Sequence, residues 1–174
     1  FQVTYTALGE NTGNVPLFDV QLLDDLATTF GTVQGSQGAV NAPGEYFASL
    51  GAIDTSGVTN GGNTTFSANG AYTGTGPNTG LLDPSAAGSL SPGDLVRIPI
   101  TVTFVPPVGV TSFDNQATAT GDAAANGVAN ADTTDTSTDG VDPDVDDDGD
   151  GGTGPDDGNG DPSDNDAPTT ISMT

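Results

Sequence analysis

The apolar residues of this chain are distributed very unevenly, and this limits how much of it can fold around a core. Residues 1–121 hold 31 of the 35 Leu, Ile, Val and Phe residues, whereas residues 122–174 hold only four. A segment with so few large apolar side chains cannot bury enough surface to offset its conformational entropy. We therefore predict a folded domain over 1–121, an appended linker over 122–169 and a short strand over 170–174.

Alternation of apolar and polar residues predicts β-strands in the first domain. The alternation is longest over residues 96–104 and recurs over residues 1–6. Ala and Thr residues over 115–120 predict a last short strand. With 26 Gly, 12 Pro and no sustained 3.6-residue period, helices are not expected, so we predict an all-β domain with long loops.

Turn and breaker residues predict a hairpin and the position of the long strand, but they do not place strands in the middle of the domain. Asn and Gly residues at 11–14 predict a hairpin between the first strand and the apolar run over 15–23. Pro99 lacks a backbone N–H, so the long strand is expected to lie at a sheet edge or to be bulged there. Between Gly31 and Gly93, the pattern does not place strands.

The charge of the chain excludes several classes of function. The chain has 24 acidic residues, one basic residue, Arg97, and no Lys, His or Cys, which gives a formal net charge of -23. Binding to nucleic acid or to an anionic membrane surface needs basic residues, so neither partner is expected. No apolar run reaches the roughly 18 residues of a membrane span, so membrane insertion is not expected.

Enzymatic activity is not expected either. Without His, Lys or Cys, the chain lacks the usual bases and nucleophiles, and it lacks the ligands of ordinary zinc sites. Asp54 to Gly57 only approximates an aspartic protease signature, and the chain has no second copy of it. A glycosidase pair could include Glu10 or Glu45, but no motif selects two carboxylates. Asn63 begins the one Asn-x-Thr sequence, which we interpret as a loop.

Three groups of residues resemble one known family. They are Phe1-Gln2-Val3-Thr4-Tyr5-Thr6 with Asn11-Thr12-Gly13-Asn14, Leu90-Ser91-Pro92-Gly93-Asp94, and Phe113-Asp114-Asn115-Gln116-Ala117-Thr118-Ala119-Thr120. In order and spacing they resemble the bacterial surface repeat known as domain of unknown function eleven. The resemblance implies an immunoglobulin-like β-sandwich in tandem arrays on secreted or cell-surface proteins. It therefore implies an extracellular location at the cell surface.

The C-terminal residues supply what the resemblance lacks at the start. Family members usually have one more short strand before the strand that here begins at Phe1, and residues 170–174 resemble that strand. Ile171 and Met173, two residues apart, would face one side of a sheet. We expect this segment to complete a neighbouring unit, by strand addition between subunits or as part of a longer repeat chain, the alternative being a loose tail. We also expect the chain to be a processed subunit or one unit of a longer protein.

The linker has the spacing of calcium ligands. Aspartates at alternate positions followed by Gly suit a hard cation, because alternate side chains converge and Gly allows a sharp turn. Two overlapping loops begin at Asp144 and Asp146, and only the second has an acid, Asp157, at its twelfth position. The linker resembles the loops of thrombospondin type 3 repeats, and a disordered polyacidic linker is the alternative. The predicted calcium ligands are Asp139, Asp142, Asp144, Asp146, Asp148, Asp150, Asp157, Asn159, Asp161 and Asp164.

These observations favour a structural function. We expect a subunit or tandem repeat of an extracellular bacterial filament or stalk, stiffened by calcium and joined to copies of itself by strand addition. The alternative is an adhesin module that binds a glycan or another cell through the long loops between Gly31 and Gly93.

Overall fold

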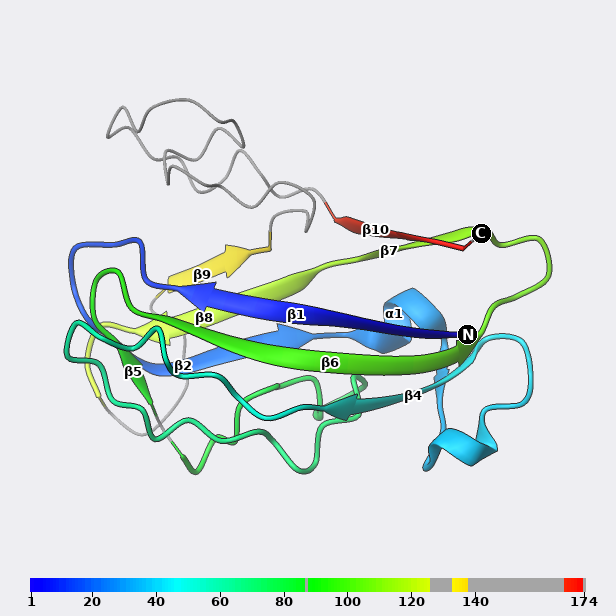
Figure 1. Ribbon diagram of the computed structural model, residues 1–174, viewed down its shortest axis with the longest axis horizontal. Coiled ribbons are helices and arrows are strands. Elements are labelled where there is room, and N and C mark those ends of the chain that lie inside the picture. The colour runs from blue at the N-terminus through cyan, green and yellow to red at the C-terminus, as the bar shows by residue number, and fades with distance from the viewer. Residues whose placement is uncertain (87, 126–132, 138–167, 174) are drawn as a thin grey trace.

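The chain folds into an all-β sandwich, as predicted (Figure 1). The computed structural model describes residues 1–86, 88–125, 133–137 and 168–173. One layer has the strand order β1-β6-β4-β3, and the other has a four-stranded sheet of order β5-β2-β8-β9 and a two-stranded sheet of β10 and β7. In chain order, the elements are β1 (Gln2–Glu10), β2 (Leu17–Asp24), α1 (Leu26–Phe30), β3 (Thr32–Val33), η1 (Gln37–Ala39), β4 (Glu45–Leu50), β5 (Ser89–Leu90), β6 (Leu95–Val105), β7 (Ser112–Asn115), β8 (Ala117–Asp122), β9 (Thr133–Thr136) and β10 (Thr169–Ser172).

The predicted long strand is confirmed as β6, and its alternation builds the centre of the core. Every second residue of β6 is buried, and these side chains face β2 of the other layer. β2 contributes Val20 and Leu22 by the same period of two. The buried side chains from β6 are Val96, Ile98, Ile100, Val102 and Phe104.

Of the two positions expected for Pro99, the sheet edge is wrong, whereas the pairing on the β4 side does become irregular beside it, shifting by one residue between Gly51–Pro99 and Asp54↔Arg97. β6 lies between β1 and β4, and its pairing with β1 runs without a break from Gln2↔Thr103 to Glu10↔Leu95. Backbone groups of an antiparallel strand face its two neighbours alternately. Pro99 faces the β4 side, where β4 has ended at Leu50 and the Gly51 N–H donates to the Pro99 carbonyl at 2.8 Å. The missing N–H therefore removes one of the two bonds that this pair would otherwise form, at the point where β4 has already ended.

The predicted hairpin over residues 11–14 is also wrong, because β1 and β2 belong to different layers. The turn carries the chain across the end of the sandwich. Asn11 is buried at its start, and its side chain donates to the carbonyls of Val15 and Leu90, both at 2.8 Å. Turn residues therefore mark the reversal correctly, but the apolar rows of both strands are buried by facing each other across the core.

The segment between β4 and β5 fills one side of the sandwich with turns and isolated bridges. The backbone pairs Leu23 with Gly80 and Asp54 with Arg97, and Leu81 donates to the Leu22 carbonyl at 2.8 Å. Its large apolar side chains enter the core, which explains how a Gly- and Asn-rich stretch orders without long strands. The side chains from this segment that enter the core are Phe66, Tyr72, Leu81 and Leu82.

A buried carboxylate holds this segment to the start of β6. Asp94 is fully buried and accepts four backbone N–H bonds, from Thr59 at 2.7 Å, Asn60 at 2.5 Å, Gly62 at 2.9 Å and Ser91 at 2.9 Å. Burial alone would raise the pKa of Asp94, but these backbone donors together hold the pKa below its ordinary value. Asp94 is therefore an ionised structural anchor between two loops.

Candidate functional site

The two short strands of the tail lie end to end along one edge of the second layer. β9 pairs antiparallel with β8, and β10 pairs antiparallel with β7, which Gln116 alone separates from β8 (Figure 1). At the junction, the Ser137 N–H donates to the Ala117 carbonyl at 2.9 Å, and Thr169 lies opposite Asn115. Ser137 and Thr169, which flank residues 138–168 in the sequence, therefore both lie at the junction of β7 and β8.

This arrangement bears on the predicted linker and the predicted C-terminal strand. β9 falls inside the predicted linker over 122–169, yet it extends the sheet of the sandwich. Residues 169–172 form a strand, and within the single chain this strand pairs with its own β7. Completion of a neighbouring unit by this segment stays a prediction.

The seat of β10 is apolar. Ile171 lies opposite Phe113, and Ile171 and Met173 are half-buried against the core. Behind them the rings of Phe30, Phe104 and Phe113 form a cluster, with centroid distances of 4.8 Å (Phe30–Phe104), 5.0 Å (Phe30–Phe113) and 5.4 Å (Phe104–Phe113). Alternation through β10 and the residue after it thus directs Ile171 and Met173 inward, as predicted from their spacing.

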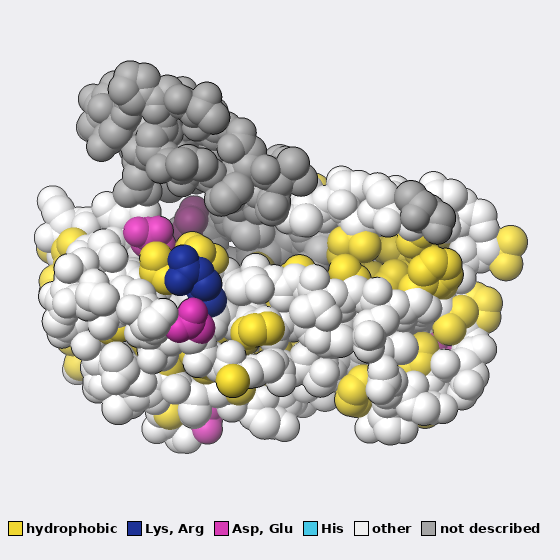
Figure 2. All heavy atoms as spheres, viewed as in Figure 1, with side chains coloured by type: hydrophobic (Ala, Val, Ile, Leu, Met, Phe, Trp, Pro, Cys, Tyr) yellow, Lys and Arg dark blue, Asp and Glu magenta, His cyan; other side chains and the backbone are white. Residues whose placement is uncertain are grey.

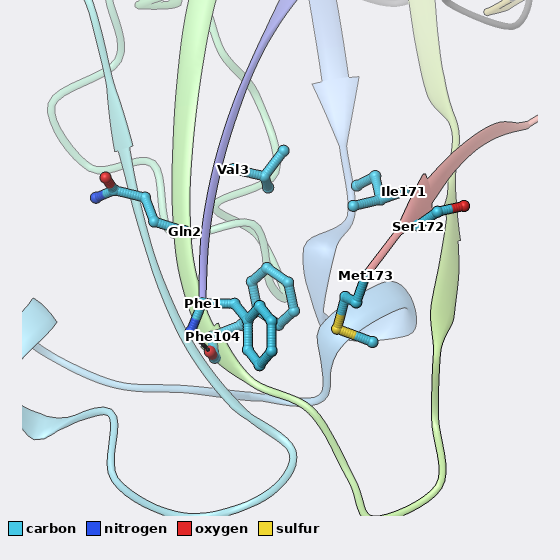
Figure 3. A pocket seen from close by; sticks show the side chains of 7 residues that line it. All are labelled: Phe1, Gln2, Val3, Phe104, Ile171, Ser172 and Met173. Atoms are coloured by element: carbon cyan, nitrogen blue, oxygen red, sulfur yellow. Dashed lines mark hydrogen bonds between the residues drawn. The ribbon is translucent and has the colours of Figure 1, made fainter.

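A groove separates β10 from the start of β1. It has a volume of about 190 Å³ and is lined by Phe1, Gln2, Val3, Phe104, Ile171, Ser172 and Met173 (Figure 3). Figure 2 shows apolar side chains gathered on the surface here, between β10 and the start of β1. Pockets for small organic ligands are usually larger, at about 300 Å³ or more, and have converging polar groups. This groove is therefore smaller than a typical small-molecule site.

A polar cluster is buried behind this groove. The Tyr5 hydroxyl donates to Asp24 Oδ2 at 2.6 Å, and Asn115 Nδ2 lies 3.2 Å from Asp24 Oδ1. The Thr29 hydroxyl donates to Asn115 Oδ1 at 2.9 Å. β1, β2, α1 and β7 each contribute one of these side chains, so the cluster ties both layers together beside β10.

Burial is the largest cause of the pKa shifts in this cluster. It raises the pKa of Asp24 more than the hydrogen bonds from Tyr5 and Asn115 lower it. Burial, followed by the charge of Asp24, raises the pKa of Tyr5, so the phenol stays protonated and acts as a donor. Asp24 was not among the residues predicted for a site. The sequence does contain a signal for its burial, because Val20, Leu22 and Asp24 form one inward row of β2.

The ten predicted calcium ligands, from Asp139 to Asp164, lie outside the described residues. Within 1–86, 88–125, 133–137 and 168–173, no group of three or more acidic side chains is placed to hold a metal ion. The same ranges contain no helix with the length and hydropathy needed to cross a membrane.

The other carboxylates and loop residues considered from the sequence serve to hold turns or to fill the core. Asp54 Oδ1 accepts the Ser56 N–H at 2.9 Å, and Glu45 Oε2 accepts the N–H groups of Asn41 and Ala42 at 2.9 and 2.8 Å, so both carboxylates close turns. In the long middle loops, Phe66 and Tyr72 are buried and are not displayed to a ligand.

Comparisons with protein families, curated proteins and solved structures find no match to this chain. The resemblance to the bacterial surface repeat therefore stays a prediction, and the geometry beside β10 carries the functional argument.

Proposed function

We propose that this chain is an immunoglobulin-like structural module of an extracellular bacterial assembly, in which copies are joined by exchange of β10. The observation that carries the proposal is the attachment of β10. This strand pairs along β7 through four residues, and 31 residues of sequence, 138–168, separate it from Ser137 beside β9.

Exchange would replace every contact of β10 by the same contact made to another copy. The fully buried apolar side chains of the described core include none from β10, so the sandwich keeps its core while β10 is away. A 31-residue connection reaches up to about 100 Å when extended, enough to reach a neighbouring molecule. The balance between the closed and exchanged forms then depends on protein concentration and on the stiffness of the connection.

Calcium bound to the connection is the second part of the proposal. Residues 138–168 contain twelve carboxylates and no basic residue, so they repel one another. Each bound calcium ion would remove two negative charges, and oxygen ligands at this spacing suit calcium. Neutralisation would fix the distance between each sandwich and its exchanged strand, giving the assembly a defined repeat at the cell surface.

Ile171→Asp is expected to abolish the exchange of β10, because it would place a charge in the apolar seat beside Phe113. Ser172→Asp is the matched control, since Ser172 is exposed on the opposite face of the same strand. Light scattering over a range of concentrations should show assemblies larger than a dimer for the unmodified chain and for Ser172→Asp, and none larger than a dimer for Ile171→Asp.

The vacant seat also allows a direct binding test. A labelled peptide of residues 168–174 should bind saturably to the Ile171→Asp chain, and the same peptide carrying Ile171→Asp should not. An unmodified chain that stays monomeric at every concentration, together with a peptide that does not bind, would contradict exchange.

Calcium is expected to protect the connection from a protease that cleaves beside aspartate. Calorimetric titration should show heat of binding that is lost in a variant with Asp146, Asp148 and Asp150 all replaced by Asn. This variant keeps the length and the turn residues of the segment. Equal cleavage rates with calcium and with chelator would show that the predicted ligands do not hold the ion.

A further inference from the structure

The outer edge of β1 presents unpaired backbone groups. Phe1 and Phe104 exchange two backbone bonds, of 2.8 and 3.0 Å, so the backbone groups of odd-numbered residues face β6. Those of Gln2, Thr4, Thr6 and Leu8 point the other way, and in the described part of the chain no strand pairs with them. Figure 1 shows this edge running beside β10 without joining it.

This edge lacks the features that normally prevent strand addition. Exposed edges are usually protected by Lys, Pro, a bulge or an inward charge. β1 has none of these before Glu10, and its register with β6 is unbroken over nine residues. Phe1 and Leu8, near the two ends of the edge, are 65% and 49% exposed. Such an edge is suited to pairing with another strand.

We infer that the partner is β1 of a second copy, paired antiparallel about a two-fold axis at Tyr5. This register places Thr4 opposite Thr6 and Gln2 opposite Leu8 of the other copy, so no charge faces a like charge. It forms about eight backbone hydrogen bonds, two for each outward-facing pair.

The groove supports this choice of partner. On the inward face, the same register places Val3 opposite Ala7 and Phe1 opposite Gly9 of the second copy. The groove beside Phe1 and Val3 holds only about 190 Å³, which suits the small Ala7 and Gly9. The register therefore brings no large side chain against Phe1 or Val3. Because each copy carries a net charge of -23, the dimer should strengthen as ionic strength rises, whereas a basic partner would bind less tightly.

Cysteine cross-linking tests the pairing and its register, because the chain has no native cysteine. A mixture of Thr4→Cys and Thr6→Cys chains should form mixed disulfide dimers under mild oxidation, since the paired Cα atoms would lie about 5.5 Å apart. Each variant alone should stay largely monomeric on a non-reducing gel. Equal cross-linking of Thr4→Cys with itself would overturn the register.

Sedimentation of a second pair of variants tests the edge itself. Thr6→Pro removes an outward N–H while leaving the bonds to β6, and it should weaken dimerisation about 30-fold, because symmetry removes two hydrogen bonds. Thr6→Val keeps the N–H and should dimerise normally. The Ile171→Asp chain should still dimerise, so failure of β10 exchange and failure of this edge are distinguishable. An Ile171→Asp chain that is monomeric at high ionic strength would overturn the inference.

Discussion

Replacing Asp94 by Ala is expected to lower the free energy of unfolding by about 3 kcal/mol or more, one of the two largest effects we predict for a single side chain. Four backbone N–H groups, of Thr59, Asn60, Gly62 and Ser91, would lose a charged acceptor in a site without solvent access. Loops 59–62 and 91–94 would then lose their common anchor. Urea denaturation at pH 7 measures the change.

Asp83→Ala is the control for this substitution. Asp83 also closes a turn, but its bonds go only to Ser85 two residues away, so its loss should matter much less. An Asp94→Ala chain as stable as the Asp83→Ala chain would contradict the anchor.

The pH dependence at Asp94 gives a separate measurement. Its folded pKa is lowered, so the stabilisation is present above the unfolded pKa, near 3.8, and is lost as pH falls through the folded pKa. In Asp94→Asn, the amide cannot ionise and this loss should disappear. Other turn carboxylates, at Glu45, Asp54 and Asp83, also have lowered pKa values, so the acid limb should become shallower without vanishing.

Period-two alternation was sufficient to predict the two longest strands of the fold. β6 and β1 follow it closely, because each buries one face and exposes the other. The last strand predicted, over residues 115–120, corresponds to β8, which begins at Ala117, and Asn115 is the last residue of β7 just before it. The same rule would have placed Asp24 inward, had the row from Val20 been continued one step.

Long-range pairing could not be predicted from local patterns. Turn chemistry at residues 11–14 marks a reversal, but it does not reveal that β2 joins the other layer. Pro99 is tolerated in a central strand only because β4 has ended beside it, which depends on residues 50 positions away. The anchoring of Asp94 depends on three N–H groups from a loop more than 30 residues earlier. β9 is too short and too polar to be recognised without β8.

The second large effect is expected at the buried cluster, where mild acid should stabilise the protein. Asp24 has a folded pKa above its unfolded value, so the folded state holds the proton to a higher pH than the unfolded state does. Stability therefore falls as pH rises from the unfolded pKa through the folded pKa. Below the unfolded pKa, the loss of stability at Asp94 takes over. The temperature of thermal unfolding should therefore be highest at mildly acidic pH.

Asn115→Ala should separate this effect from general charge repulsion. It removes one of the two side-chain donors to Asp24 and leaves the Tyr5 hydroxyl as the other. The titratable groups around the cluster do not change, since Asp25 still supplies a nearby charge and Tyr72 stays neutral. The folded pKa of Asp24 should rise further, so the variant should lose about 2 kcal/mol at pH 7 and less at pH 5. In Asp24→Asn, the carboxyl is gone, and stability should change little between these pH values. An unmodified chain and an Asp24→Asn chain with the same pH profile would place the titration elsewhere, and Asp24 would then be only a hydrogen-bond acceptor of the core.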